Sequence, residues 1–303
     1  MSAHVVRLAP SDPGYPALLA TIPSPPTLDV LGGFVSGDAL AIAIVGARRA
    51  TEYGLEVAES LAADLAARGV TVVSGLARGI DTAAHRGALA AGGRTIAVLG
   101  SGIERVYPPE NRRLAAEIVS QGAVVSQFPR EADALPFHFP LRNRTLAGLA
   151  QGVVVVEAAE RSGALITAGL AGELGREVFA VPGRITSPAS RGANGLLRDG
   201  AKLVEHWSDI VAELSEPWRS MVDATMSASV PSQEAVLAPG SDEQRMLELL
   251  TVEEAQHIER LIARADIDAA RVGVALTALE LAGRARQLGG QRWVAAGARA
   301  RRA

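Results

Sequence analysis

An octapeptide from Phe137 to Arg144, FHFPLRNR, combines residue types that recognise nucleic acids. It places two aromatic side chains beside two arginines and an asparagine. Aromatic rings stack on unpaired bases and guanidinium groups contact the phosphates between them, which is typical of single-strand recognition. A structural interpretation is also open, in which both phenylalanines pack in the core and the arginines lie on the solvated surface.

Glycines, hydroxyls and arginines recur where the predicted strands end. Ligands of doubly wound sheets bind beside the carboxyl ends of the strands. Glycine lets a backbone approach a ligand closely, helix N-termini attract anions, and arginine offers paired donors to phosphate oxygens. We therefore expect a phosphate-bearing ligand rather than a neutral one. The candidate binding residues are Gly46, Arg48, Arg49, Gly75, Arg78, Gly79, Phe139, Arg142, Asn143, Arg144, Ser162, Gly163, Arg191 and Asn194.

The usual nucleotide-binding motifs are missing from the sequence. Gly46 alone follows the first strand, where a dinucleotide fingerprint needs G-x-G-x-x-G, and Gly100-x-Gly102 lacks the third glycine. There is no Walker A motif, and Lys202 is the only lysine. A G-x-S-x-G nucleophile elbow is absent as well. We therefore expect no bound cofactor, no metal and no catalytic residue.

Three titratable residues could act as acids or bases, and each has a structural alternative. His85 follows Asp81 by one helical turn, and packing or helix capping is favoured over acid–base chemistry. His138 stands between two phenylalanines, where stacking or packing is favoured in the same way. Glu157 follows the fifth strand and either bonds a sugar or base or caps the next helix.

Short apolar strands alternate with helices from about residue 40 to residue 214. Their unbroken apolar content predicts burial on both faces, as in a parallel sheet. The fold class is therefore α/β, with a doubly wound and mainly parallel sheet. The expected strands are 41–45, 71–74, 95–99, 123–126, 153–157 and 177–181, and the expected helices are 52–68, 81–91, 109–121, 143–150 and 164–174.

Changes in composition divide the chain into four parts. Residues 1–35 are rich in proline and predict a mostly extended N-terminal arm, and 36–214 form the α/β domain. Residues 215–240 are rich in Ser, Ala and Pro and predict a linker. Residues 241–303 carry three helical segments and a hairpin with a Gly-Gly turn, which matches a winged helix.

Composition and charge exclude several classes of protein. The chain has 303 residues and no cysteine, so disulfides, thiolate metal sites and a cysteine nucleophile are excluded. A net charge of −3 argues against a uniformly basic nucleic-acid binder, although the tail from Arg284 onward has several arginines and no acid. No apolar run has the form of a signal peptide or a membrane span, so we expect a cytoplasmic protein without a membrane partner.

Several longer strings resemble the DNA-processing protein A family, also called DprA or Smf. The similarity covers about residues 40–215, and the N-terminal arm and the C-terminal module also look like parts of this family. The strings are VSGLARGIDTAAHRGAL (73–89), TIAVLGSGIERVYPPENRRLAAEI (95–118), FPLRNRTLAGLAQGVVVVEAAERSGALITA (139–168), GREVFAVPG (175–183) and SRGANGLLRDGAKLV (190–204).

The resemblance implies an extended Rossmann-like domain that binds single-stranded DNA. It implies a protein that protects incoming DNA in natural transformation or repair, loads the RecA recombinase, and forms a homodimer through the Rossmann domain without catalytic turnover. On this basis Arg48, Arg142 and Arg144 are the leading phosphate contacts, and Phe139 or a neighbour stacks on a base. The chain departs from the family pattern at Ala47, usually Ser or Thr, and at Gln127, usually Glu.

Two alternatives stay open at this point. The first is a Rossmann-like nucleotide phosphoribohydrolase with Glu157 as its acid, although the P-G-G-x-G-T-x-x-E motif of those enzymes is absent. The second concerns the winged module, which either binds duplex DNA or mediates protein contacts. Asp268 and Glu280 on its predicted recognition helix weaken the duplex interpretation, and we favour a protein-contact or auxiliary role.

Overall fold

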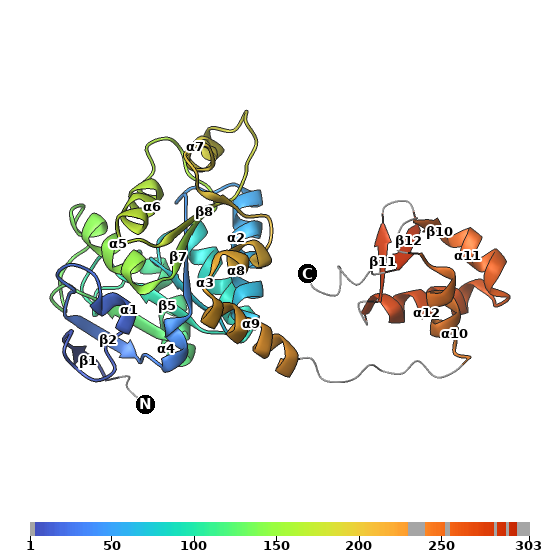
Figure 1. Cartoon of the computed structure of the whole chain (residues 1–303), viewed down its shortest axis with the longest axis horizontal. Coiled ribbons are helices and arrows are strands. Elements are labelled where there is room, and N and C mark those ends of the chain that lie inside the picture. The colour runs from blue at the N-terminus through green and yellow to red at the C-terminus, as the bar shows by residue number, and fades with distance from the viewer. Residues whose placement is uncertain (1–3, 230–239, 252–254, 282–283, 289–290, 296–303) are drawn as a thin grey trace. The chain divides into compact units, whose positions relative to one another are not determined.

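The computed structural model describes residues 4–229, 240–251, 255–281, 284–288 and 291–295 (Figure 1). The chain divides into two compact units, residues 1–228 and 229–303. Each unit has its own core and is described by itself. Within these described ranges, no helix is both long and apolar enough to cross a membrane.

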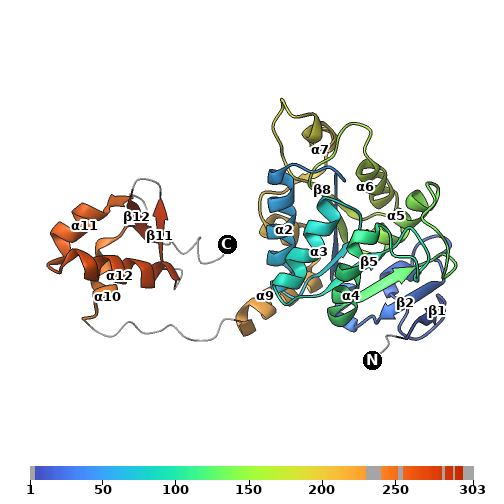
Figure 2. The same ribbon diagram turned by 180° about the vertical axis from the view of Figure 1, so that it is seen from behind.

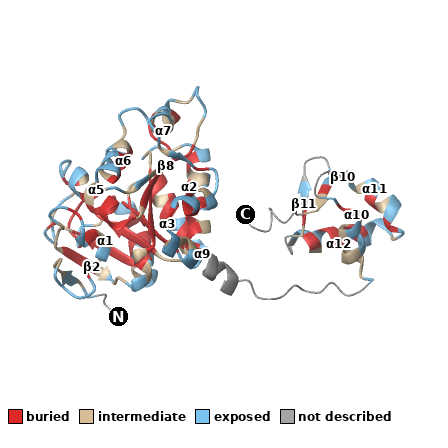
Figure 3. Cartoon of the chain, in the orientation of Figure 1, coloured by how far each residue is buried: buried red, intermediate tan, exposed pale blue. Residues whose placement is uncertain are grey.

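A nine-stranded sheet forms the centre of the first unit, in the order β1-β2-β6-β5-β4-β3-β7-β8-β9. The strands from β6 to β9 are parallel, which confirms the predicted α/β class. All residues of the four central strands are buried, as their apolar sequences predict (Figure 3). The parallel strands are β3 (Ala41–Val45), β4 (Thr71–Ser74), β5 (Thr95–Val98), β6 (Ala123–Ser126), β7 (Gly152–Val155), β8 (Glu177–Ala180) and β9 (Lys202–Leu203).

The N-terminal segment belongs to this sheet and is not only an extended arm. β1 (Val6–Leu8) pairs antiparallel with β2 (Leu28–Gly32), and β2 pairs antiparallel with β6. Between them lies the short helix α1 (Ala17–Ala20), whose Leu19 is buried. The segment that begins at Leu28 forms this strand, and its first three residues, which include Asp29, are buried.

The order of the strands reverses beside β3. The chain builds β3, β4, β5 and β6 in one direction and then returns to add β7 on the other side of β3. The loops that leave the carboxyl ends of β3 and β7 therefore diverge, which opens a crevice at that edge of the sheet.

Helices cover both faces of the sheet (Figures 1 and 2). Alternate residues of β3 point to opposite sides, so Ile42 and Ile44 pack with one group of helices and Ala41 and Ala43 with the other. The first group is α2 (Glu52–Ala67), α3 (Ile80–Ala90) and α8 (Trp207–Glu213), and the second is α1, α5 (His138–Leu149) and α6 (Gly163–Glu173). The other helices that precede β9 are η1 (Ser36–Ala39), η2 (Pro109–Asn111), α4 (Arg112–Gln121), η3 (Pro188–Ser190) and α7 (Arg191–Arg198).

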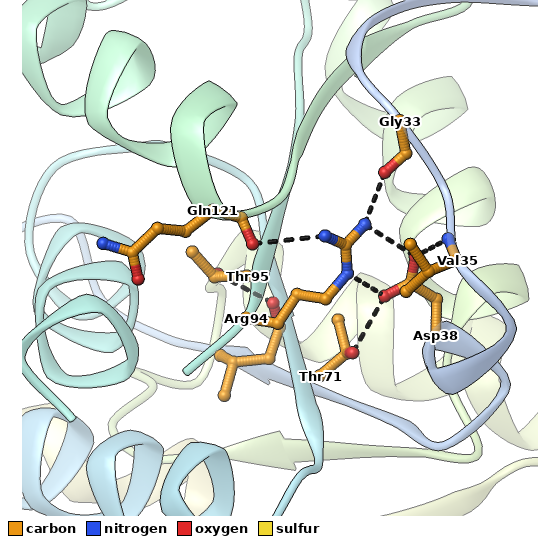
Figure 4. A network of polar contacts seen from close by, with 8 residues as sticks. Gly33, Val35, Asp38, Thr71, Arg94, Thr95 and Gln121 are labelled. Atoms are coloured by element: carbon orange, nitrogen blue, oxygen red, sulfur yellow. Dashed lines mark hydrogen bonds and ion pairs between the residues drawn. The ribbon is translucent and has the colours of Figure 1, made fainter. Parts of the chain in front are cut away.

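A polar network joins the amino-terminal ends of the strands (Figure 4). Arg94 donates to both carboxylate oxygens of Asp38, at 2.6 and 3.0 Å, and to the carbonyl oxygens of Gly33 and Gln121. Thr71 donates to the same carboxylate at 2.9 Å. Because these donors are committed to protein oxygens at the edge opposite the crevice, Arg94 is a structural residue.

The predicted linker begins with a helix, α9 (Glu216–Ser229). Its Trp218 and Val222 pack against the core beneath α2 and α8, which accounts for regular structure in a segment that shows little periodicity. Residues 230–239, the second half of the predicted linker, lie outside the described residues.

The second unit is a winged helix, as predicted. The hairpin of β11 and β12 has the predicted strands, and a further short strand, β10, pairs with β12 to give the order β10-β12-β11. Met246, Leu261, Leu276 and Trp293 meet in its core. Its elements are α10 (Asp242–Leu249), β10 (Gln256–His257), α11 (Ile258–Ala265), α12 (Ala269–Leu281), β11 (Ala285–Leu288) and β12 (Arg292–Ala295).

Candidate nucleic-acid interface

A cavity of ≈630 Å³ opens at the crevice beside β3. It brings together seven of the predicted binding residues from three separate parts of the sequence. These are Gly46 and Arg48 after β3, Phe139, Arg142 and Asn143 on α5, and Ser162 and Gly163 at the start of α6. We call it the switch-point cavity.

Arg48 presents an exposed guanidinium group to this cavity. Its Cζ lies 4.8 Å from the centre of the Phe139 ring, which is cation–π geometry. The edge of Tyr107 approaches the same ring, with 6.3 Å between the two ring centres. Phe139 is half-buried on Gly100, where an added Cβ would lie 3.0 Å from the ring. Arg48 and Phe139 therefore form one charged and aromatic wall.

Two glycines hold the loop that carries Arg48. The Ile80 N–H donates to the carbonyl oxygen of Ala47 at 3.2 Å, which ties this loop to the start of α3. A Cβ at Gly46 would lie 2.5 Å from the Ile80 side chain, and one at Gly79 would overlap the Ala47 carbonyl oxygen. Gly79 also has φ +74°, which favours glycine, and it is the N-cap of α3.

Arg142 lies behind this wall and does not present a free guanidinium group. It is only 4% exposed. It donates to the carbonyl oxygens of Gly75 and Val98 and to Asn143 Oδ1. We predicted a leading phosphate contact here, and the structure instead gives Arg142 the task of joining the loops after β4 and β5. The helix α5 begins at His138, five residues before the predicted start. Arg142 therefore lies within the helix, on the same buried side as His138 and Leu146.

Asp81 balances this buried charge. Its carboxylate accepts hydrogen bonds from the N–H groups of Gly75, at 3.1 Å, and Ala77, at 3.3 Å. Burial raises the pKa of Asp81, against the opposing effects of Arg142 and these two donors, and burial lowers the pKa of Arg142, against Asp81. A Cβ at Gly75 would overlap Arg142 Nη1, so the loop closes around the pair only with glycine at this position.

The first turn of α6 also lines the cavity. Ser162 is the N-cap and accepts a hydrogen bond from the Ala164 N–H at 3.3 Å. Gly163 is exposed, and a Cβ there would meet open space. The Leu165 N–H donates to the Ser162 carbonyl oxygen at 3.1 Å, which leaves the Gly163 N–H of this turn to donate to an anionic ligand.

Seven candidates lie outside the lining of the cavity. Gly75 and Gly79 shape its loops, as described above. Arg49 faces a neighbouring groove, and Arg78 pairs with Glu110. Three others serve elsewhere in the fold: Arg144 donates to Pro23 O at 3.5 Å, Asn194 bonds both backbone groups of Gly183, and Arg191 is exposed at the start of α7.

The sequence did not single out several lining residues. They include Tyr107, Ala134, Pro136 and Ile166. Apolar residues of this kind give no sequence signal for a site, because their types are those of any loop or helix. Gln127, a departure from the family pattern, accepts a hydrogen bond from Thr145 on α5 and does not line the cavity.

The titratable residues have structural roles. Glu157 is buried and accepts hydrogen bonds from the N–H and the hydroxyl of Thr51, at 2.9 and 2.7 Å, so it holds the start of α2 rather than of the next helix. His85 bonds Thr95, and His138 stacks on Phe128 with 4.0 Å between ring centres. The packing interpretation of both histidines is confirmed. Among the described residues, no three His, Cys, Asp or Glu side chains gather to hold a metal ion.

Comparison with known families decides the assignment. Residues 7–215 match the family described as DNA recombination-mediator protein A, which is most of the chain. The chain belongs to this family. Residues 230–291 match the DprA winged helix domain. The predicted DprA/Smf resemblance is therefore confirmed, and the chain is a member of a family of DNA-processing recombination mediators.

Individual relatives agree with this assignment. The chain is 44% identical to Protein Smf of Escherichia coli over 77% of its own length and 63% of that protein, so it spans less than two thirds of this relative. It is 41% identical to the DNA processing protein DprA of Bacillus subtilis, over 67% of the chain and 69% of the relative.

Two solved structures share its fold. The crystal structure of DprA from Streptococcus pneumoniae has a TM-score of 0.66 and 41% identity, covering 70% of this chain and 75% of that one. DprA from Helicobacter pylori, described for its single-stranded DNA binding mode, has a TM-score of 0.61 and 26% identity, covering 75% and 98%.

Proposed function

We propose that this protein is a single-stranded DNA-binding recombination mediator and that the switch-point cavity holds the strand. The observation that carries the proposal is the wall formed by exposed Arg48 over Phe139, in a cavity that the N-terminus of α6 also lines. A cation, an aromatic ring and a helix N-terminus in one cavity match the phosphates and bases of an unpaired strand.

Each part of the cavity has a chemical task in this proposal. Arg48 and the Gly163 N–H bind phosphate oxygens, and Phe139 or Tyr107 contacts a base. Arg142 is a positioning residue, because its donors hold the loops after β4 and β5. Binding through phosphates and ring faces is independent of base sequence, as a mediator of recombination requires.

The role in the cell follows from the family. We propose that the protein protects incoming single strands and loads the RecA recombinase onto them in natural transformation or repair, in the cytoplasm and without catalytic turnover. We also propose a homodimer through the Rossmann-like domain of residues 36–214. Two cavities on one dimer would let a strand bridge both, which raises the overall affinity.

Arg48→Ala tests the cavity directly. We expect single-strand affinity to fall at least tenfold, and the dependence of affinity on salt to weaken by about 0.7 per lost phosphate contact. Fluorescence anisotropy with labelled single-stranded and duplex oligonucleotides of equal length, across a salt series, measures both quantities.

Arg113→Ala is the matched control. It removes the same charge from a side chain that is 93% exposed on α4, where it pairs with Glu117. If Arg48→Ala binds single strands as tightly as Arg113→Ala does, the cavity is not the binding site. If the unmodified protein binds neither form of DNA, the proposed function is wrong.

A further inference from the structure

A second depression adjoins the switch-point cavity and shares Arg48 with it. It has a volume of ≈340 Å³ and lies where the first turns of α2 and α3 meet the loop after β3. Its cationic lining residues are Arg48, Arg49 and Arg86, and Glu59 is its acidic lining residue. We call it the α2–α3 groove.

Arg49 and Arg86 have guanidinium groups that are available to a ligand. Both residues are exposed, and neither has a hydrogen-bond or ion-pair partner in the part of the chain that the structure describes. Other arginines near the cavity are committed, because Arg78 pairs with Glu110 and Arg142 bonds backbone carbonyls. The groove therefore carries a net positive charge beside the cavity, because its three arginines outnumber Glu59.

The backbone that carries these arginines is held in place. The loop of Arg48 and Arg49 is tied to α3 through the Ile80 N–H and the Ala47 carbonyl oxygen, 3.2 Å apart. Next to Arg86, α3 approaches α2 so closely that a Cβ at Gly87 would overlap the carbonyl oxygen of Glu59. The spacing of the three cations is thus set by packed helices and not by free loops.

We propose that the α2–α3 groove is a second subsite for the phosphodiester backbone of the same DNA strand. This inference rests on the proposed function of the cavity. A strand that leaves the cavity passes Arg48, which lines both depressions, and its next phosphates reach Arg49 and Arg86. The other lining groups are small or aliphatic, including Ala50, Leu55 and Ala83, so the groove contacts phosphates and provides no ring for a base.

Strand length separates the two subsites in an experiment. An oligonucleotide of about 6 nucleotides fills the cavity alone, whereas one of about 20 also reaches the groove. With Arg86→Ala we expect the affinity for the long strand to fall about threefold to tenfold and its salt slope to weaken by about 0.7, with the short strand unaffected. Anisotropy titrations at several salt concentrations give all three values.

Two further variants make the test specific. Arg113→Ala removes an equal charge on α4 and should leave both lengths unchanged. Glu59→Gln removes the acidic group of the groove and should strengthen binding of the long strand only.

The inference is overturned if Arg86→Ala matches Arg113→Ala on the long strand, or if it weakens both lengths equally. If the unmodified protein binds neither length, the proposed function fails and the subsite falls with it. If the short strand binds to the unmodified protein but the affinity for the long strand is the same with and without Arg86, the subsite is contradicted and the proposed function of the cavity stands.

Discussion

Arg142 and His85 are both buried, yet they hold different charge states. Arg142 keeps its proton and donates to two carbonyl oxygens. Burial, with the nearby charge of Arg142 adding to it, lowers the pKa of His85 to about 3. The imidazole is therefore neutral in the folded protein and is hydrogen-bonded to Thr95. At the scale of single residues, burial excludes the charged form of His85, and the charge of Arg142 adds to this effect.

This exclusion makes folding stability depend on pH. Below pH 6.5 the unfolded chain protonates His85 and the folded protein does not, so the free energy of unfolding decreases as the pH falls from 6.5 toward 3. For this group alone we expect a loss of about 2 kcal/mol between pH 7 and pH 5. Urea unfolding at the two pH values measures it.

His85→Gln isolates the contribution of His85, because all other titratable groups are unchanged. We expect the variant to be less stable at pH 7 but to lose about 2 kcal/mol less than the unmodified protein on going to pH 5. An equal loss in both proteins would mean that His85 is protonated in the folded state.

At the scale of elements, the close packing of α2 against α3 fixes the positions of the residues that line the groove. α2 and α3 approach closely at Gly87, whereas Gly169 on α6 faces open space. Both glycines lie inside helices, so the same substitution at each separates the effect of close packing from that of helix propensity.

Gly87→Ala should destabilise the protein by about 1–3 kcal/mol, because its Cβ would overlap backbone that cannot move without separating α2 from α3. Gly169→Ala should stabilise it by about 0.5–1 kcal/mol through helix propensity. Urea unfolding gives both values. Similar effects at the two positions would show that the contact between α2 and α3 is loose.

The sequence predicts the core elements well because their apolar residues must be buried in the interior of the sheet. The central strands are unbroken apolar runs, and their predicted bounds agree with the structure to within about two residues. The sequence predicts that α5 starts at Asn143, whereas it starts at His138 in the structure. Pro140 interrupts the helical pattern in the sequence, but proline is tolerated in the first turn of a helix. Strands β1 and β2 were missed since a proline-rich segment gives a weak strand signal.

The site is less predictable than the fold. Gly46, Arg48 and Ser162 each follow the end of a predicted strand, and they line one cavity in the structure. They meet there because the carboxyl ends of parallel strands lie at the same edge of the sheet. The same pattern could not distinguish exposed Arg48 from buried Arg142, since both are arginines near glycines. The burial of Arg142 depends on which side of α5 faces the sheet. A helix predicted to start five residues too late leaves Arg142 outside the helix, so the sequence does not show that it is on the buried side.

At the scale of the whole molecule, the two units have separate hydrophobic cores. In the second unit, Arg271 at the start of α12 makes two hydrogen bonds to Asp242, at 2.7 and 2.8 Å. That basic side chain of the predicted recognition helix is therefore engaged within the unit, which supports a protein contact over duplex recognition.

Removing residues 241–303 should leave single-strand affinity within about twofold, because the cavity and the groove lie in the first unit. Duplex affinity should also change little. Anisotropy with both forms of DNA checks this, and thermal unfolding shows whether the first unit keeps its midpoint. A large loss of duplex affinity would instead assign duplex binding to the winged module.

The ends of the nine-stranded sheet have a consequence for self-association. The outermost strands are very short: β1 has three residues and includes Arg7, and β9 has two and begins with Lys202. Short edge strands with charged side chains expose few unpaired backbone groups to another chain, which disfavours edge-to-edge aggregation of the sheets. A second copy that joins this unit must therefore meet it through helices or loops, and concentrated solutions should remain free of strand-exchanged aggregates.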